Sequence, residues 1–158
     1  MSKDGLILGI GNRFRRDDGL GPLAVQALQQ RSWPIPAPDF ACCSGEGTQL
    51  MAAWQGYQWV LLIDAIAAGR SDHAAGQLLC WDALTETIPQ ELFHYSSHAF
   101  GLAEAVEMAR ALGELPPQLW IYGLSGADFG AGEGLSEAVS AALPLLLDAV
   151  CQRIRQQP

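Results

Sequence analysis

Apolar and polar residues follow each other along the chain in blocks of the lengths that strands and helices need. Short apolar runs bounded by turn-forming residues predict strands, and apolar residues spaced three and four apart predict helices. The predicted strands are Leu6–Ile10, Asp39–Cys43, Trp59–Ile63, Gln77–Trp81 and Leu119–Leu124. The predicted helices are Gly19–Gln30, a short one that ends at Trp54, residues 102–112 and Ser136–Arg155.

This alternation of strands and helices predicts an α/β fold with a largely parallel sheet. Trp59–Ile63 has no polar residue, as expected of a central strand covered on both faces. Gln77–Trp81 fits an edge strand whose direction the sequence leaves open. The 158 residues show no internal repeat and suffice for one core. We therefore predict a single domain over residues 1–158, with three layers: a twisted, mostly parallel five-stranded sheet and helices on both faces.

Composition restricts the possible partners. Hydrophobic residues make up 49% of the chain and the formal net charge is -8, so the protein is globular and acidic. Nucleic-acid binding is disfavoured because the only concentrated basic patch is Arg13–Arg16, although this patch can grip an acidic segment of a partner. No apolar run has the roughly 18 residues of a membrane span. Met1–Asp4 leads straight into the first strand and leaves no room for a signal peptide. We expect a cytoplasmic protein, either a monomer or a weak dimer.

The cysteines do not form a metal-binding or disulfide pattern. They are Cys42, Cys43, Cys80 and Cys151, and no pair has the C-x-x-C spacing. We expect them to be buried apolar side chains in a reducing compartment. A nucleophilic role for Cys42 or Cys43 is disfavoured because both belong to an apolar strand.

The first candidate for chemistry is a pair of aspartates after the first strand. The strand ends in Gly9-Ile10-Gly11-Asn12, and Asp17 and Asp18 follow where a helix is expected to start. Ligands of open α/β sheets bind at this carboxyl edge. The positive end of the helix dipole favours an ionised carboxylate at Asp18. The alternative is that Asp18, or equally Asp17, caps the helix.

Asp64 and His98 are the other candidates. Asp64 follows five apolar residues, so we expect it to end that strand and leave the core, because burial of an unpaired carboxylate is costly. A hydrogen bond to a neighbouring loop is the alternative. His98 follows Ser96–Ser97, which can cap the next helix, and an imidazole at a helix start stays neutral and free to bind a metal. A partly exposed histidine without a role is the alternative. His73 and His94 have no comparable position.

Taken together, Asp18, Asp64 and His98 predict a metal site with open coordination positions, which is typical of catalytic sites. Zinc, nickel, iron and manganese all suit such a set, and spacing does not choose among them. Dinucleotide binding is a weak alternative because Phe14 breaks the G-x-G-x-x-G pattern. No G-x-S-x-G motif is present for a serine nucleophile.

These motifs resemble those of the hydrogenase maturation endopeptidases, which trim the C-terminus of the large subunit of nickel-iron hydrogenases. The resemblance lies in Gly9–Asn12 with Asp17–Gly21, in Leu62–Ala65, and in Ser97-His98 followed by Gly101-Leu102. It implies a sheet flanked by helices and a nickel-dependent protease, aspartic-type by classification, without a serine or cysteine nucleophile. It also implies that Asp18, Asp64 and His98 are the catalytic residues and nickel ligands, and that the precursor of a large subunit is the substrate and supplies the nickel.

Two segments depart from the family's pattern. Gly123–Gly126 stands where many members have Gly-x-Glu-Pro or Gly-x-Gln-Pro, and Gly45–Thr48 stands where members often have Asp-Gly-Gly-Thr. We expect these positions to shape the substrate groove, so they bear on which hydrogenase is the partner.

Three other functions compete with the protease. The first is a peptidyl-tRNA hydrolase, which shares the Gly-x-Gly-Asn strand end but expects a proline where this acidic chain has Arg13. The second is a nickel-dependent chaperone that binds the precursor without cutting it. The third is a plain nucleotide-binding α/β domain.

Overall fold

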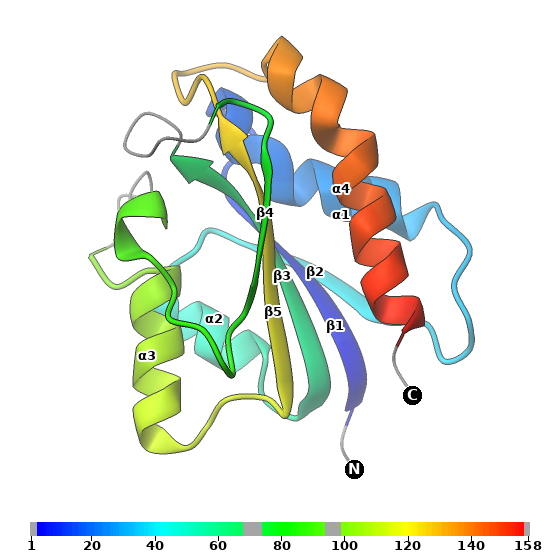
Figure 1. The fold of residues 1–158 in the computed structure, drawn as a ribbon, viewed down its shortest axis with the longest axis vertical. Helices are drawn as coiled ribbons and strands as arrows, with labels where there is room; N and C mark the ends of the chain where they lie inside the picture. Colours follow the sequence, from blue (N-terminus) through cyan, green and yellow to red (C-terminus); the bar gives the residue numbers. More distant parts are fainter. Residues whose placement is uncertain (1–2, 68–73, 94–98, 157–158) are drawn as a thin grey trace.

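A twisted sheet forms the middle layer of the protein (Figure 1). The structure is a computed structural model that describes residues 3–67, 74–93 and 99–156. Its strands are β1 (Lys3–Ile10), β2 (Asp39–Cys43), β3 (Tyr57–Ala67), β4 (Leu78–Asp82) and β5 (Gln118–Gly126). Its α-helices are α1 (Leu20–Gln29), α2 (Gly47–Ala53), α3 (Leu102–Leu112) and α4 (Glu137–Arg155), and its 3₁₀ helices are η1 (Arg16–Gly19) and η3 (Gln90–Phe93).

The strand order places a switch in direction next to β1. The order is β2-β1-β3-β5-β4, with parallel pairing except between β4 and β5. The chain moves from β1 to one edge of the sheet, and from β3 towards the other edge. The boundary between β1 and β3 is therefore the topological switch point, where open α/β sheets bind their ligands.

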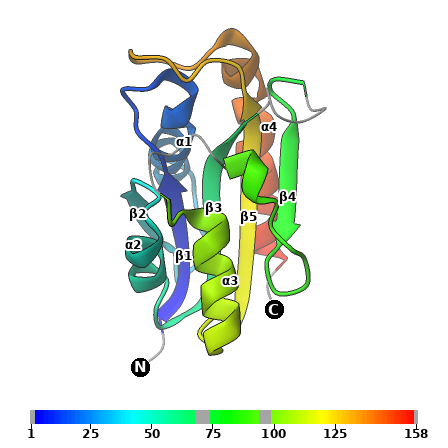
Figure 2. The same ribbon diagram turned by 90° about the vertical axis from the view of Figure 1, so that its left-hand side faces the viewer.

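Helices cover both faces of the sheet (Figure 2). Alternate residues of β3 belong to two separate apolar cores, because successive strand side chains point to opposite faces. Leu62 and Ile66 pack in the core that α2 and α3 cover, and Leu61 and Ile63 pack in the core of α1 and α4. The predicted three-layer α/β fold with a mostly parallel five-stranded sheet is confirmed. Within the described residues no helix is long and apolar enough to cross a membrane.

The central strand is longer than the sequence predicts. β3 ends at Ala67, so the prediction that Asp64 ends the strand is wrong. β3 continues because its last residues, from Asp64 to Ala67, pair with residues 123–126 of β5, although pairing with β1 stops at Ile63. Main-chain pairing on one side thus carries Asp64 inside the sheet as a buried residue.

The cysteines are also less buried than predicted. Cys42 and Cys80 are exposed, Cys43 is half-buried and only Cys151 is buried among these free thiols. The reason is position in the sheet, since β2 and β4 are its edge strands and have a neighbour on one side only. Apolar sequence alone does not distinguish an edge strand from a central one.

Close packing of α1 on the strand ends depends on Gly21. A Cβ at Gly21 would lie 2.3 Å from the carbonyl oxygen of Ile10 and 2.7 Å from that of Ile63. Both contacts are with main-chain atoms, which cannot turn away as a side chain can. Gly21 therefore allows α1 to begin directly against the end of β1 and against β3 at Ile63.

We expect Gly21→Ala to lower the free energy of unfolding by about 1–3 kcal/mol, the usual cost of overpacking. The matched control is Gln26→Ala on the exposed side of α1, which should change stability by less than about 0.5 kcal/mol. Urea denaturation followed by tryptophan fluorescence measures both. Equal stability of the Gly21 variant and the wild type would show that α1 does not need this close approach.

Candidate functional site

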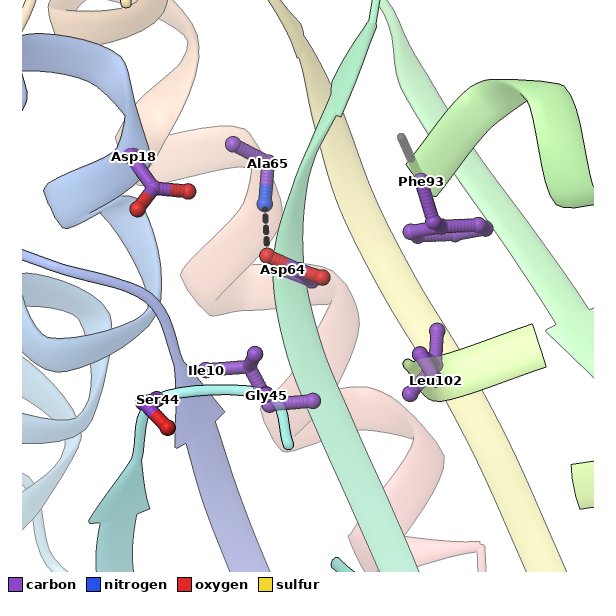
Figure 3. A pocket seen from close by; sticks show the side chains of 8 residues that line it. All are labelled: Ile10, Asp18, Ser44, Gly45, Asp64, Ala65, Phe93 and Leu102. Carbon is purple, nitrogen blue, oxygen red and sulfur yellow. Dashed lines mark hydrogen bonds between the residues drawn. The ribbon is translucent and has the colours of Figure 1, made fainter. Parts of the chain in front are cut away.

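A small pocket opens at the carboxyl end of the sheet, beside the switch point (Figure 3). Its volume of about 10 Å³ is close to that of one water molecule or a single ion. β1, β3 and the segments after β2 and before α3 contribute to it. The lining residues are Ile10, Asp18, Ser44, Gly45, Asp64, Ala65, Phe93 and Leu102. Two of the three predicted ligands, Asp18 and Asp64, thus meet in one ion-sized pocket.

Asp18 is held at the pocket by the turn after β1. Gly11 has a φ of 137°, and a Cβ there would lie 1.9 Å from the main-chain oxygen of Asp18, so only glycine lets the two segments approach. The amide of Asn12 donates to Asp18 Oδ2 at 2.9 Å. Burial raises the pKa of Asp18, and the Asn12 hydrogen bond and the charge of Arg15 oppose that rise.

Asp64 reaches the same pocket from the centre of the sheet. It is 9% exposed, and the amide of Ala65 donates to its Oδ1 at 2.8 Å. Burial, followed by the negative charge of Asp18, raises the pKa of Asp64 well above its usual value. A buried carboxylate whose pKa is raised further by a neighbouring carboxylate favours a bound proton or a bound cation at this place.

His98, the third predicted ligand, lies outside the described residues. Among the residues that the structure describes, no three His, Cys, Asp or Glu side chains form a metal-binding group. Phe93 and Leu102, which precede and follow His98 in the chain, both line the pocket. α3 begins at Leu102 with Gly101 as its N-cap, so the prediction that Ser96–Ser97 caps this helix is wrong.

The segment after His98 is fastened to α2. The amide of Gly47 donates to the carbonyl of Phe100 at 2.8 Å. A Cβ at Gly47 would lie 2.2 Å from the Phe100 ring, so the ring rests on the glycine. Glu46 accepts hydrogen bonds from the amides of Thr48 and Gln49 at 3.1 and 3.0 Å and caps α2. In this chain the Gly45–Thr48 departure therefore supports the pocket wall, with Gly45 in the lining.

Asp17 is the important residue that sequence analysis missed. It is fully buried and caps neither η1 nor α1. Instead its carboxylate accepts from the amides of Ala127 at 2.7 Å, Asp128 at 3.0 Å and Ser136 at 2.7 Å, and from the Ser136 hydroxyl at 2.8 Å. These bonds tie the loop after β5 to the turn that holds Asp18. The capping alternative is wrong for both aspartates, because the N-cap of α1 is Gly19 without a side-chain bond.

Ser125 lies in the other segment that departs from the family's pattern, Gly123–Gly126. It is fully buried, and its hydroxyl accepts from the amide of Gln77 at 3.0 Å and donates to the carbonyl of Ala74. Gly126 follows, where a Cβ would lie 2.5 Å from the Phe129 ring. This segment fixes the chain before β4 and does not line the pocket.

Ser44 is a further pocket residue without a signal in the sequence. Its hydroxyl donates to Gln49 Oε1 at 3.3 Å. It follows β2 and lines the pocket next to Gly45. Its position depends on the turn between β2 and α2, which no motif marks.

Asp64→Asn tests the electrostatics of the metal-free protein. Because the pKa of Asp64 is raised in the folded state, folding favours its protonated form, and stability falls as pH rises from the unfolded pKa, about 4, through the folded pKa. Asp64→Asn removes this cost, so it should be more stable than the wild type at neutral pH and should lose that part of the pH dependence. Urea denaturation at pH 5 and pH 8 measures the effect.

The control for this comparison is Glu114→Gln, a neutralised carboxylate at an exposed position. It should follow the wild-type pH dependence. If the wild type became more stable relative to Asp64→Asn as pH rises, that result would contradict the raised pKa of Asp64.

Asp17→Ala leaves the amides of Ala127, Asp128 and Ser136 without their acceptor. We expect it to lower the free energy of unfolding by about 2–4 kcal/mol, since a hydrogen bond to a charged group contributes about 1.5–3 kcal/mol. Hydrogen exchange should accelerate first at Ala127, Asp128 and Ser136. Glu133→Ala in the same loop is the control, because its side chain is exposed. Unchanged exchange in the Asp17 variant would contradict the anchoring role.

Comparison with known proteins agrees with this architecture. The family model HycI, described as hydrogenase maturation protease, matches residues 45–153. The chain is 25% identical over 154 residues to the hydrogenase 2 maturation protease of Escherichia coli K12, covering 96% of this chain and 90% of the relative.

Solved structures show the same fold. The solution structure of an endopeptidase from Escherichia coli matches with a TM-score of 0.83 and 25% identity, over 97% of this chain and 93% of that one. The hydrogenase maturating endopeptidase HybD of Escherichia coli has a TM-score of 0.77 and 23% identity, with the same coverage of 97% and 93%. The predicted resemblance to the hydrogenase maturation endopeptidases is thus confirmed. This protein belongs to the hydrogenase maturation protease family.

Proposed function

We propose that the protein is an endopeptidase that removes the C-terminal peptide from the precursor of a nickel-iron hydrogenase large subunit after nickel insertion. Family membership supports a protease of this class and argues against a peptidyl-tRNA hydrolase or a nucleotide-binding domain. The observation that supports a metal-dependent mode is the meeting of Asp18 and Asp64 in one ion-sized pocket.

In this proposal Asp18, Asp64 and His98 bind nickel that the precursor brings on its own cysteines. Carboxylate oxygens and an imidazole are suitable ligands, and the pocket has the volume of an ion. The raised pKa of both carboxylates supports the fit, because a cation would relieve their burial and mutual repulsion. Phe93 and Leu102 in the lining support a place for His98 near the pocket.

The chain's own residues would position the substrate. Asp64 is fixed inside the sheet and Asp18 is fixed by Gly11 and Asn12, so neither carboxylate needs to reorganise when the precursor arrives. Nickel would supply a Lewis acid that polarises the scissile carbonyl or activates a water molecule. Because the substrate carries the ion, cleavage would wait for nickel insertion. The resting protein would hold little or no metal.

Replacement of each ligand tests the proposal. Asp18→Asn, Asp64→Asn and His98→Gln should each slow processing of nickel-loaded precursor by more than about 100-fold, because even residues that only orient metal ligands are worth about 10–100-fold. Mass spectrometry of the precursor measures cleavage directly. Nickel-free precursor should stay intact with the wild type.

The controls are Glu114→Gln and His73→Gln, which remove a carboxylate and an imidazole that have no place in the proposal. Both should process at the wild-type rate. Wild-type rates in any ligand variant would remove that residue from the proposed set. Binding of nickel-loaded precursor without any cleavage by the wild type would favour the chaperone alternative.

A further inference from the structure

A basic and aromatic loop lies beside the candidate site and has no role in it. The residues Arg13, Phe14, Arg15 and Arg16 are all exposed, Phe14 by 61%. They include three of the nine Lys and Arg residues in a chain of net charge -8. Figure 2 shows this turn after β1 at the carboxyl end of the sheet, next to the loop after β5. An exposed cationic cluster on an acidic protein is suited to binding an anionic partner.

Internal ion pairs do not account for these arginines. In residues 3–67, 74–93 and 99–156 the ion pairs are Arg31–Asp148 and Arg110–Glu107. Arg16 instead donates to the main-chain oxygen of Glu133 at 3.4 Å, which holds it against the loop after β5. The main chain of the loop is fixed as well, because the amide of Arg16 donates to Gly132 and the amide of Gly132 donates to Phe14, both at 2.9 Å. The cluster is thus presented on a rigid turn.

A groove begins at this turn. It has a volume of about 550 Å³ and lies between the start of α1 and the end of β2. Arg13 and Asn12 line one end, Gln26 lies on its helix wall, and the exposed Cys42 lies on its strand wall. Ser44 lines both this groove and the ion-sized pocket. The groove therefore lies next to the pocket that Asp18 and Asp64 line, with Ser44 between them.

Arg13 lines this groove and Arg15 follows on the same exposed turn, and neither forms an ion pair within the part of the chain that the structure describes. The charge of Arg13 acts on the Cys42 thiol and lowers its pKa against the effect of burial. The charge of Arg15 acts in the same way on Asp18 in the pocket. Arg13 thus lies near the groove wall and Arg15 near the pocket.

We propose that Arg13 and Arg15 bind an acidic segment of the precursor, which lies in extended form in the groove between α1 and β2 and enters the pocket past Ser44. This inference rests on the proposed function and adds a determinant of substrate choice. Because groove and pocket share Ser44 as a wall, the segment in the groove would lie close to the scissile bond. The charge favours an acidic one, because the rest of this acidic protein repels such a segment.

The experiment measures binding separately from cleavage. Fluorescence anisotropy of labelled precursor is recorded with Asp64→Asn protein, which blocks turnover under the proposed function. Adding Arg13→Gln and Arg15→Gln should raise Kd about tenfold at low salt, as expected for the loss of two ion pairs, and should weaken its salt dependence. The control pair Arg31→Gln and Arg155→Gln removes equal charge elsewhere and should change Kd by less than about twofold.

The position of the segment is tested through Cys42. In a Cys80→Ser background, which removes the other exposed thiol, bound precursor should protect Cys42 from maleimide labelling. A precursor with Asp and Glu near the cleavage site changed to Asn and Gln should bind about tenfold more weakly. It should lose no further affinity when Arg13 and Arg15 are replaced, because the same ion pairs are already absent.

Each outcome has one consequence. Tenfold loss with the Arg13 and Arg15 pair alone, together with protection of Cys42, supports the inference. Equal losses of affinity in both arginine pairs, or full labelling of Cys42 in the complex, overturn the inference. If the wild type still processes the precursor in that case, the proposed function remains intact. A precursor that the wild type neither binds nor cleaves removes both.

Discussion

The site depends on one mismatch in the sheet, where β1 stops and β3 continues. Main-chain pairing with β5 carries β3 past Ile63, and this pairing holds Asp64 as a buried residue inside the sheet. A carboxylate in that position is unfavourable by itself, and the neighbouring charge of Asp18 makes it more so. Burial of the Asp64 carboxylate beside Asp18 is thus unfavourable for folding, and a cation bound in the pocket would offset this free energy.

Glycines and one buried aspartate keep this arrangement in register. Gly21 lets α1 start against the strand ends, and Gly11 lets the main chain of Asp18 approach the turn. Asp17 then joins that turn to the loop after β5 through main-chain amides. The adjacent aspartates have different tasks: Asp17 is buried and accepts hydrogen bonds from the loop after β5, whereas Asp18 lines the pocket. The same turn presents the arginines that we propose as a docking site for an acidic segment.

Much of the fold could be predicted because hydrophobic periodicity reports directly on which side of an element is buried. The strands and the main helices followed from this periodicity. The meeting of Asp18 with Asp64 was predicted from a shared edge of the sheet, although Asp64 lies within β3 and not at its end. The extent of β3 could not be predicted, because it is set by pairing with β5 and not by its own composition. The role of Asp17 depends on contacts with residues 127–136, more than a hundred positions away, and exposure of Cys42 depends on β2 being an edge strand. Long-range pairing of this kind leaves no local pattern.

The central claim is that carboxylates of this protein enter the coordination shell of nickel carried by the precursor. X-ray absorption at the nickel K-edge tests it directly, on nickel-loaded precursor alone and in complex with the protein under conditions that block turnover. The account predicts that oxygen or nitrogen ligands join the sulfur shell in the complex, and that fewer join with Asp18→Asn. A nickel spectrum identical in free and bound precursor would contradict it.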